Sequence, residues 1–323
     1  MRAARTQRGI ALVTAVMIVA IAAAITAQIA FAHQIWTRQM ENIFDRGATD
    51  WLRRGALHWA STALIEDAAQ GNTVDHLGER WAMGLPVLPV EGGTIRVSIE
   101  DGQSRFNLNN LVRNNLASPT DIAVLQRLLE TLRLDPSLAH AVVDWIDPDG
   151  NTSPGGAEDI DYLNGSPPYR AANRPLASVE ELRLVRGFDL KTFVTLAPYV
   201  TVLPAATTVV NVNTASPELL AAIVPGLDIA TALRIADDRR TNPFRDLPSF
   251  SSRLPRGIAL PPSVASVTSD YFLVTLDTSI GRHERRSEAL LQRVAGGKST
   301  ELIWHRPHPL IALNVNETDE SRQ

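Results

Sequence analysis

The chain has 323 residues, of which 45% are hydrophobic and 20% are charged, and its formal net charge is −4. This length allows for a sizeable hydrophobic core and two modules. The slightly acidic balance provides no general electrostatic attraction to nucleic acid. Because the chain contains no cysteine, thiol catalysis, thiolate zinc sites and disulfide bonds are excluded.

The N-terminus predicts a membrane anchor behind a short basic leader. Residues 1–9 carry three arginines and no acid, and residues 10–32 carry no charged side chain. A bilayer span needs about 20 apolar residues, so this stretch is long enough. The charge pattern predicts a single-pass transmembrane helix over 10–33, with the N-terminus in the cytoplasm. The alternative is a signal peptide cleaved near Ala32, but the apolar core of such peptides is shorter, at about 7–15 residues.

Gly9 lies where the leader meets the apolar stretch, and a helical pattern continues past the membrane among charged residues. The apolar positions of this continuation are Trp36, Met40, Ile43, Trp51, Leu57 and Leu64. One long helix, half in lipid and half on a domain, is the shape of a type IV pilin-like subunit. The N-terminus resembles the class III leaders of that superfamily. This resemblance implies that a prepilin peptidase cuts between Gly9 and Ile10 and that the apolar helix is retained.

The rest of the chain predicts an α+β fold. Residues 92–111 predict a strand, a turn and a strand. Helices are predicted over 118–134, with Pro119 in the first position, over 137–146, and over 177–188, with Ser178 and Glu181 as a capping box. Residues 208–227 predict a strand leading into a capped helix, and three segments after residue 268 alternate like an antiparallel meander (269–280, 285–294 and 299–306).

These elements predict an N-terminal helix packed on an antiparallel sheet, with a large helical insertion. The predicted divisions are a leader (1–9), a transmembrane helix (10–33), a first pilin-like part (34–112), an insertion (113–263), returning strands (264–306) and a disordered tail (307–323).

An acidic loop over residues 144–162 is a candidate calcium site. Calcium takes about 6–8 oxygen ligands, and Asp147, Asp149, Asn151 and Glu158 half-match the spacing of an EF-hand loop. Thr152 stands where that pattern requires glycine, and no amphipathic helix is predicted after Glu158, which argues against an EF-hand. The oxygen-rich chemistry remains, with Asp159 and Asp161 adding carboxylates. Calcium suits this loop better than magnesium, and a solvated acidic loop is the alternative.

Taken together, several motifs resemble the K-type minor pseudopilin of the type II secretion system, the general secretion pathway protein K family. They are the glycine-terminated leader, LGERWA, GQSRFNLNNL, the acidic loop, SVEELRLVRGF and VNVNTASPELLAAI, and the similarity runs from residue 9 to about residue 250. The resemblance implies a pilin-like fold with an inserted helical domain that binds two calcium ions. The implied calcium ligands are Asp147, Asp149, Glu158, Asp159 and Asp161, and less directly Asp144 and Asn151, whose places backbone carbonyls can fill.

The resemblance also implies location and partners. The subunit would be anchored in the inner membrane, with its globular part in the periplasm. It would cap the tip of a short pseudopilus together with the I- and J-type minor pseudopilins, above the major pseudopilin, and so support export across the outer membrane.

The sequence disfavours two other function classes. The segment after Val210 is similar to a helix-hairpin-helix of competence DNA receptors, and residues 177–188 could form a second copy. Such hairpins bind phosphate on backbone N–H groups, but here Asp228 follows the turn and puts a carboxylate toward the phosphate. An enzyme is also disfavoured, because no nucleophile-elbow, zincin or P-loop motif occurs. The chain is therefore interpreted as a non-enzyme that does not bind nucleic acid.

Thr14 is the fifth residue if Ile10 is the first of the mature chain. Most pilin-like subunits have a glutamate there, which pairs with the N-terminal amine of an adjacent subunit. A subunit without a neighbour above it has no amine to neutralise, so a small polar residue would serve. The alternative is a tolerated substitution whose hydroxyl bonds a backbone carbonyl one turn back.

The leader gives the first prediction. In cells that also express a prepilin peptidase, Gly9→Val should leave the full-length precursor, because a β-branched residue obstructs the approach of the protease to the backbone. Sequencing of the mature parent protein should begin at Ile10, with a methylated amine. Cleavage near Ala32 would instead identify a signal peptide.

Overall fold

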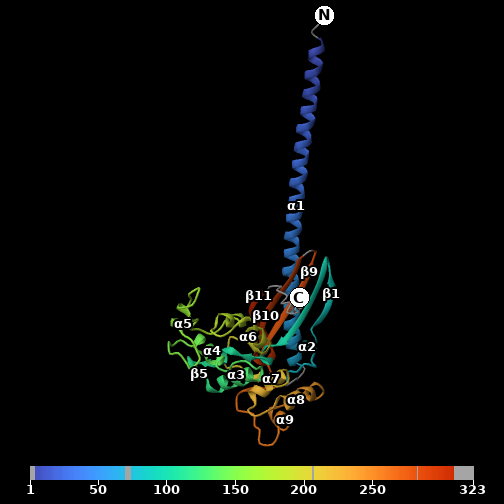
Figure 1. The fold of residues 1–323 in the computed structure, drawn as a ribbon. Helices are drawn as coiled ribbons and strands as arrows, with labels where there is room; N and C mark the ends of the chain where they lie inside the picture. The colour runs from blue at the N-terminus through green and yellow to red at the C-terminus, as the bar shows by residue number, and fades with distance from the viewer. Residues whose placement is uncertain (1–3, 70–73, 206, 282, 309–323) are drawn as a thin grey trace, which may run out of the picture.

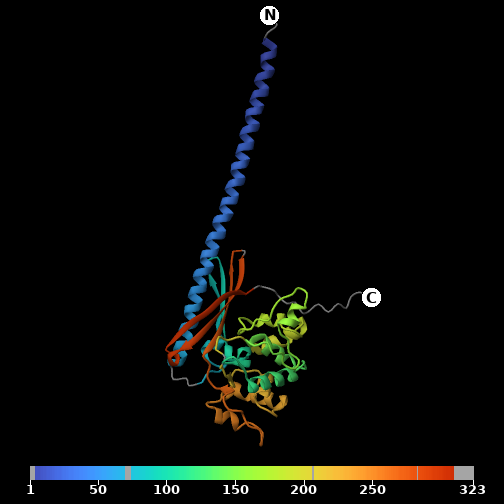
Figure 2. The ribbon, with the colours of Figure 1, turned by 90° about the vertical axis from the view of Figure 1, so that its left-hand side faces the viewer.

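The structure begins with a single long helix whose C-terminal part packs on the globular part of the molecule. The computed structural model describes residues 4–69, 74–205, 207–281 and 283–308. Helix α1, Ala4–Ala69, has 66 residues and is therefore about 100 Å long. Its N-terminal half projects away from all other elements (Figures 1 and 2). The helix runs without a break through the predicted leader boundary at Gly9.

The projecting half of α1 has the composition of a membrane span. Its most apolar window has a mean hydropathy of 2.6 and is wholly unburied, which by length and composition is enough to cross a membrane. Beyond the span, Trp36 and Trp51 are also exposed on the helix. Asn42 on the helix already meets the sheet, with its Oδ1 3.1 Å from His283 Nε2. Hydrophobic packing starts at Leu52, and the buried hydrophobic residues of the helix are Ala56, Leu57, Ala60 and Leu64.

The last third of α1 packs on an antiparallel sheet of five strands. The strands are β1 (Leu85–Val90), β2 (Gly93–Asp101), β9 (Tyr271–Ile280), β10 (His283–Val294) and β11 (Ser299–His308), and their order in the sheet is β1-β2-β9-β10-β11. The central pair β2 and β9 joins the two ends of the globular part, with Val97 opposite Leu276. A short 3-10 turn, Ala295–Gly297, connects β10 to β11.

Alternating side chains give this sheet two buried faces. Val97 on β2 and Val274 on β9 point toward α1. Trp81 on the short helix α2 (Arg80–Met83) closes this core and meets Phe272 edge to face, with ring centroids 5.2 Å apart. On the opposite face, Tyr271 packs with Leu203 from the insertion. The sheet is thus a middle layer between the anchor helix and part of the insertion (Figure 2).

Two predictions for the first strands need correction. The strand predicted after the turn at residues 100–104 is only β3, Phe106–Asn107, and it pairs in parallel with β6, Val200–Thr201. The edge strand β1 was not predicted, because its prolines, Pro86 and Pro89, are unfavourable inside a sheet. They are tolerated at an edge, where a missing N–H costs no ladder bond, and a register irregularity separates Leu85 from Leu88.

The insertion lies between β2 and β9 and has its own hydrophobic core. Its helices are η1 (Gly102–Ser104), η2 (Leu108–Leu111), α3 (Pro119–Thr131), α4 (Leu138–Ile146), α5 (Asp159–Leu163), η3 (Val179–Leu184), α6 (Leu190–Leu196), η4 (Ala197–Tyr199), α7 (Pro217–Ile223), α8 (Ile229–Thr241) and α9 (Leu247–Ser251). Short strands complete it: β4 (Val112–Arg113) with β5 (Leu116–Ala117), and β7 (Val210–Asn211) with β8 (Ala265–Ser266). Its core contains Leu125, Leu128, Val142, Leu182, Leu220 and Phe250.

The predicted helices of this segment are present, with two local differences. Residues 179–184 form a 3-10 helix rather than an α-helix, although the Glu181 carboxylate accepts from the backbone N–H of Ser178 as predicted. Ser118 precedes α3 at the N-cap position, but its hydroxyl bonds the side chain of Asp121 rather than the backbone. The predicted strands over 269–280, 285–294 and 299–306 are confirmed as β9, β10 and β11. β11 continues through His308, while the rest of the predicted disordered tail lies outside the described residues.

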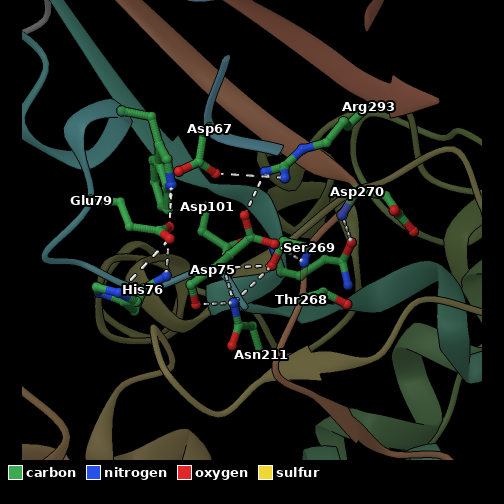
Figure 3. A network of polar contacts seen from close by, with 12 residues as sticks. Asp67, Asp75, His76, Glu79, Asp101, Asn211, Thr268, Ser269, Asp270 and Arg293 are labelled. Carbon is green, nitrogen blue, oxygen red and sulfur yellow. Dashed lines mark hydrogen bonds and ion pairs between the residues drawn. The ribbon is translucent and has the colours of Figure 1, made fainter. Parts of the chain in front are cut away.

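The connection between sheet and insertion is polar and buried (Figure 3). Asp101, at the end of β2, is 3% exposed. Its Oδ2 accepts from Asn211 Nδ2 at 3.0 Å, Ser269 Oγ at 2.7 Å and Thr214 Oγ1 at 2.5 Å, and its Oδ1 accepts from the backbone of Gln103 at 2.7 Å. Burial raises the pKa of Asp101 to about 6, against the opposing effect of these donors. One carboxylate therefore joins the sheet to two segments that enter and leave the insertion.

Asp101→Asn should lower the free energy of unfolding by about 2–4 kcal/mol, because an amide replaces an acceptor of four hydrogen bonds and turns a donor toward donors. The measurement is urea unfolding of a fragment that begins at Asn42. Asp277→Asn is the matched control, since its ion pair with Arg286 is on the surface and should cost less than about 1 kcal/mol. Equal losses in the two variants would contradict a structural role for the Asp101 network.

Candidate metal centre

The acidic loop begins at the end of a buried helix. Helix α4 is apolar and almost wholly buried, and it carries Asp144 in its last turn. Asp147 caps its C-terminus with extended backbone, donating its N–H to the carbonyl of Val143 at 2.9 Å. The chain then turns through residues 148–157 and returns at Glu158, the residue before α5. The core packing of α4 therefore sets the position of the first carboxylates.

Three of the predicted ligands come together. One carboxylate oxygen each of Asp147, Asp149 and Glu158 lies within 4.8 Å of the others, and Asp147 and Glu158 are buried. Burial, followed by the charges of Asp149 and Asp144, raises the pKa of Asp147 to about 6. Burial, followed by the charges of Asp144 and Asp147, raises the pKa of Glu158 to about 7. Without a cation, the arrangement opposes ionisation of its own carboxylates.

Buried oxygen atoms without hydrogen-bond donors face this cluster from the same loop. Within the described part of the chain, Asp144 Oδ1, Asp147 Oδ1 and Glu158 Oε1 have no hydrogen-bond partner. The other oxygen of Asp144 accepts from the backbone of Ser153 at 2.9 Å. A Cβ on Gly156 would lie 1.9 Å from that oxygen, so only glycine lets the loop close over Asp144. Orphaned carboxylate oxygens of this kind fit a hard cation, for which calcium is the flexible choice.

The other predicted ligands have different partners. The backbone of Asn151 donates to Asp149 Oδ1 at 2.8 Å, while the residue itself is exposed. Asp159 accepts from Arg170 at 3.1 Å and from the backbone of Ala171 at 3.0 Å. Asp159 is not one of the three carboxylates that converge, and the backbone contact of Asn151 leaves its place as a ligand a prediction.

Asp161 is likewise engaged elsewhere. It accepts from Arg186 at 2.9 Å and from the backbone of Glu158 at 3.1 Å, completing a cap on α5. The ion pairs with Arg170 and Arg186 were not predicted, because both arginines lie outside the loop and no sequence pattern links them to it. The segment after Glu158, expected to be loop-like, is helical for the five residues of α5.

The helix pairs that resemble helix-hairpin-helix motifs each have an aspartate at the second helix's N-cap. Asp228 Oδ1 accepts from the backbone of Thr231 at 2.9 Å, and Asp189 Oδ1 accepts from the backbone of Thr192 at 2.7 Å. These hydrogen bonds lower the pKa of both carboxyls, which therefore stay ionised. A fixed negative charge occupies the backbone N–H groups that a phosphate would need.

The predicted processing site lies on the projecting part of α1. Gly9 and Ile10 are consecutive residues of this helix, and Ile10 is exposed. One turn further on, the Thr14 hydroxyl is 3.0 Å from the carbonyls of both Ile10 and Ala11.

Comparison with known proteins identifies relatives of one kind. Two family models described as type II secretion system protein K match residues 104–205 and 210–268. The type II secretion system protein K of Pseudomonas aeruginosa is 35% identical over 306 residues, covering 91% of each chain. The protein of the same name from Aeromonas hydrophila is 30% identical over 329 residues, covering 95% of this chain and 98% of its own.

A solved structure agrees over most of the molecule. The crystal structure of the GspK-GspI-GspJ complex from the type 2 secretion system of enterotoxigenic Escherichia coli contains a chain that superposes with a TM-score of 0.74 at 26% identity. The match covers 84% of this chain and 99% of that one. The chain therefore belongs to the type II secretion system protein K family.

Proposed function

We propose that this minor pseudopilin of the type II secretion system caps the tip of the pseudopilus in complex with the I- and J-type minor pseudopilins, and so supports protein export across the outer membrane. The observation that carries the proposal is the structural match to the GspK-GspI-GspJ complex, which extends over 99% of the matched chain. In this proposal α1 is anchored in the inner membrane, its N-terminus is cytoplasmic, the globular part is periplasmic, and the major pseudopilin lies below.

The shape of the molecule supports a terminal position. In a filament built from parallel helices, each subunit needs room for the next head along the helix axis. Here the insertion, from α3 to α9, extends the head at the end opposite the N-terminus of α1 (Figures 1 and 2). Such a bulky extension obstructs a further subunit stacked above the head, whereas nothing has to stack on the last subunit.

Thr14 supports the same position. Its hydroxyl is satisfied by the carbonyls of its own helix, so the residue needs no partner from another subunit. A carboxylate within a span would cost about 2.5–3.5 kcal/mol on insertion scales unless it were paired. The threonine is thus compatible with a helix that has no neighbour above it, although a tolerated substitution would make the same two contacts.

A structural role fits the helix pairs better than DNA binding. Buried Arg239 on α8 donates to the carbonyls of Val212 and Ala215, which ties this helix to the start of α7. The N-cap carboxylates Asp228 and Asp189 oppose a phosphate at the two turns. The helices therefore serve the core of the insertion, and the subunit acts by assembly rather than by catalysis.

We further propose that the acidic loop binds calcium through Asp147, Asp149 and Glu158, with Asp144 behind them. The support is the convergence of three carboxylates with the orphaned oxygens of Asp144, Asp147 and Glu158. A bound cation would neutralise repulsion within the loop and tie the end of α4 to the start of α5. A second ion, implied by the family resemblance, stays a prediction.

Calcium should raise the melting temperature of the fragment that begins at Asn42, and EDTA should lower it. An ion that binds only the folded state adds about 2.7 kcal/mol at a hundredfold excess over its dissociation constant. Asp147→Ala combined with Glu158→Ala should reduce this difference by the contribution of the loop, and Asp246→Ala, far from the loop, should leave it unchanged. Identical melting temperatures with and without calcium would indicate that the loop is a solvated acidic loop that binds no calcium.

The calcium effect should also depend on pH. Because the folded pKa values of Asp147 and Glu158, about 6 and about 7, lie above their ordinary values, the calcium-free folded state retains protons that the unfolded state has released. The stability of the calcium-free protein should therefore fall as pH rises from 5 to 8. Calcium replaces those protons, so its increment in melting temperature should be larger at pH 8 than at pH 5. An increment independent of pH would exclude these two carboxyls as ligands.

The proposed tip position predicts the stoichiometry of the complex and the position of this subunit in the pseudopilus. Mixing the periplasmic domain with those of its I- and J-type partners should give a discrete 1:1:1 complex in light scattering. On extended pseudopili, gold-labelled antibody against this chain should mark one end, while antibody against the major pseudopilin marks the whole length. Labelling along the fibre would refute the tip position without affecting the fold.

A further inference from the structure

A second group of carboxylates lies far from the acidic loop, beneath the end of the anchor helix. Asp67 is in the last turn of α1, Asp75 lies in the segment before α2, and Glu79 is the residue directly before α2 (Figure 3). All three are buried, and one oxygen from each lies within 4.8 Å of the others.

One guanidinium offsets part of the charge of this cluster. Arg293, near the end of β10, approaches Asp75 Oδ1 at 2.5 Å and Asp67 Oδ2 at 3.8 Å, and it stacks on the ring of Phe272. When all are ionised, the three carboxylates and the Arg293 guanidinium together have a formal charge of −2. Buried charges are costly unless they are compensated, and a divalent cation supplies the compensation.

Glu79 provides an independent indication of a ligand. Its Oε2 accepts from the backbone of His76 at 3.0 Å and from the indole of Trp81 at 2.7 Å. Its Oε1 has no hydrogen-bond donor among the described residues, although Glu79 is only 7% exposed. Both Asp67 and Glu79 line a cavity of about 610 Å³ between α1 and α2. An orphaned, buried carboxylate oxygen therefore lies beside a cavity that can hold a cation with its remaining water.

His76 neither neutralises this oxygen nor competes as a ligand. Its Nδ1 accepts from the backbone of Gly78 at 3.1 Å, which leaves the ring proton on Nε2, 3.8 Å from Glu79 Oε1. Burial lowers the pKa of His76, so the ring stays neutral at neutral pH. The available donors are carboxylate oxygens, which favour a hard cation over zinc or copper.

We propose that Asp67, Asp75 and Glu79 bind one calcium ion at the edge of the cavity between α1 and α2. Magnesium is less suited, because it keeps most of its waters and is bound by one or two carboxylates rather than three. Burial raises the pKa of Asp75, and it raises that of Glu79 to about 7.

The ion would fix the junction between the anchor and the head. Asp75 Oδ2 accepts from the backbone of Ser269 at 2.7 Å, and the Asp75 carbonyl accepts from Asn211 at 3.0 Å. Cation binding would thereby couple the end of α1 and the start of α2 to Asn211 in the insertion and to Ser269 in the segment that returns to the sheet.

The test counts calcium ions on the full-length chain in detergent micelles by equilibrium dialysis with radioactive calcium. The background is Asp147→Ala with Glu158→Ala, which removes the loop site. This background should retain one calcium per chain, and adding Glu79→Gln should remove it. Glu66→Gln is the matched control, because Glu66 is an exposed carboxylate that lines the same cavity but lies outside the cluster, and it should leave the ion bound.

A thermal measurement guards against misfolding. Glutamine keeps an oxygen acceptor for Trp81 and removes a buried charge, so in EDTA the Glu79→Gln variant should melt at or above the temperature of its background. It should then show no rise with calcium, while the Glu66→Gln variant does. The proposal is overturned if the background binds no calcium, or if Glu79→Gln binds as much as its background. Equal binding by the parent and the background would count against the loop site while supporting this one.

Discussion

The buried carboxylate of Asp101 holds the insertion against the five-stranded sheet. The chain leaves the sheet at the end of β2 and returns to it at β9, so both crossings must be fixed at one edge of the central strand pair. A buried carboxylate does this by accepting from Asn211 and Thr214 on the insertion and from Ser269 on the returning segment. Because an uncompensated buried charge is costly, the donors are held in position as firmly as the acceptor. The insertion is therefore a fixed extension of the sheet.

The two carboxylate clusters extend the same principle. The loop cluster is formed by residues close in sequence, and core packing of α4 fixes where it begins. The second cluster draws on α1, the segment before α2 and α2 itself, with Arg293 from β10 beside it. In both, burial raises carboxyl pKa values and buried oxygens remain without donors. Calcium at the acidic loop would stabilise the contact between α4 and α5. Calcium at the second cluster would stabilise the contact between the end of α1 and the start of α2.

The helix pairs of the insertion illustrate how a binding motif can serve a core. A turn followed by a helix N-terminus offers backbone N–H groups to an anion. In this chain the anion is the side chain of the residue directly before the helix, which is Asp189 for α6 and Asp228 for α8. Buried Arg239 adds no charge to a binding surface, because it donates to backbone carbonyls and burial lowers its pKa to about 10. The same local geometry therefore stabilises packing instead of recognising phosphate.

The features that depend on local pattern could be predicted from the amino-acid sequence: the apolar anchor, the helical positions of the insertion, the final meander and the approach of Asp147, Asp149 and Glu158. These follow from periodicity, caps and short-range spacing, because such patterns lie within short stretches of sequence and can be recognised before the fold is known. The ion pairs of Asp159 with Arg170 and of Asp161 with Arg186, and the pairing of residues 106–107 with β6, could be seen only in the folded structure. The same holds for the meeting of Asp67, Asp75 and Glu79, and for the ion pairs of Asp67 and Asp75 with Arg293, which is distant from them in the sequence. Such contacts join segments whose separation in the chain leaves no periodic signal, because they exist only once the sheet has closed across the insertion.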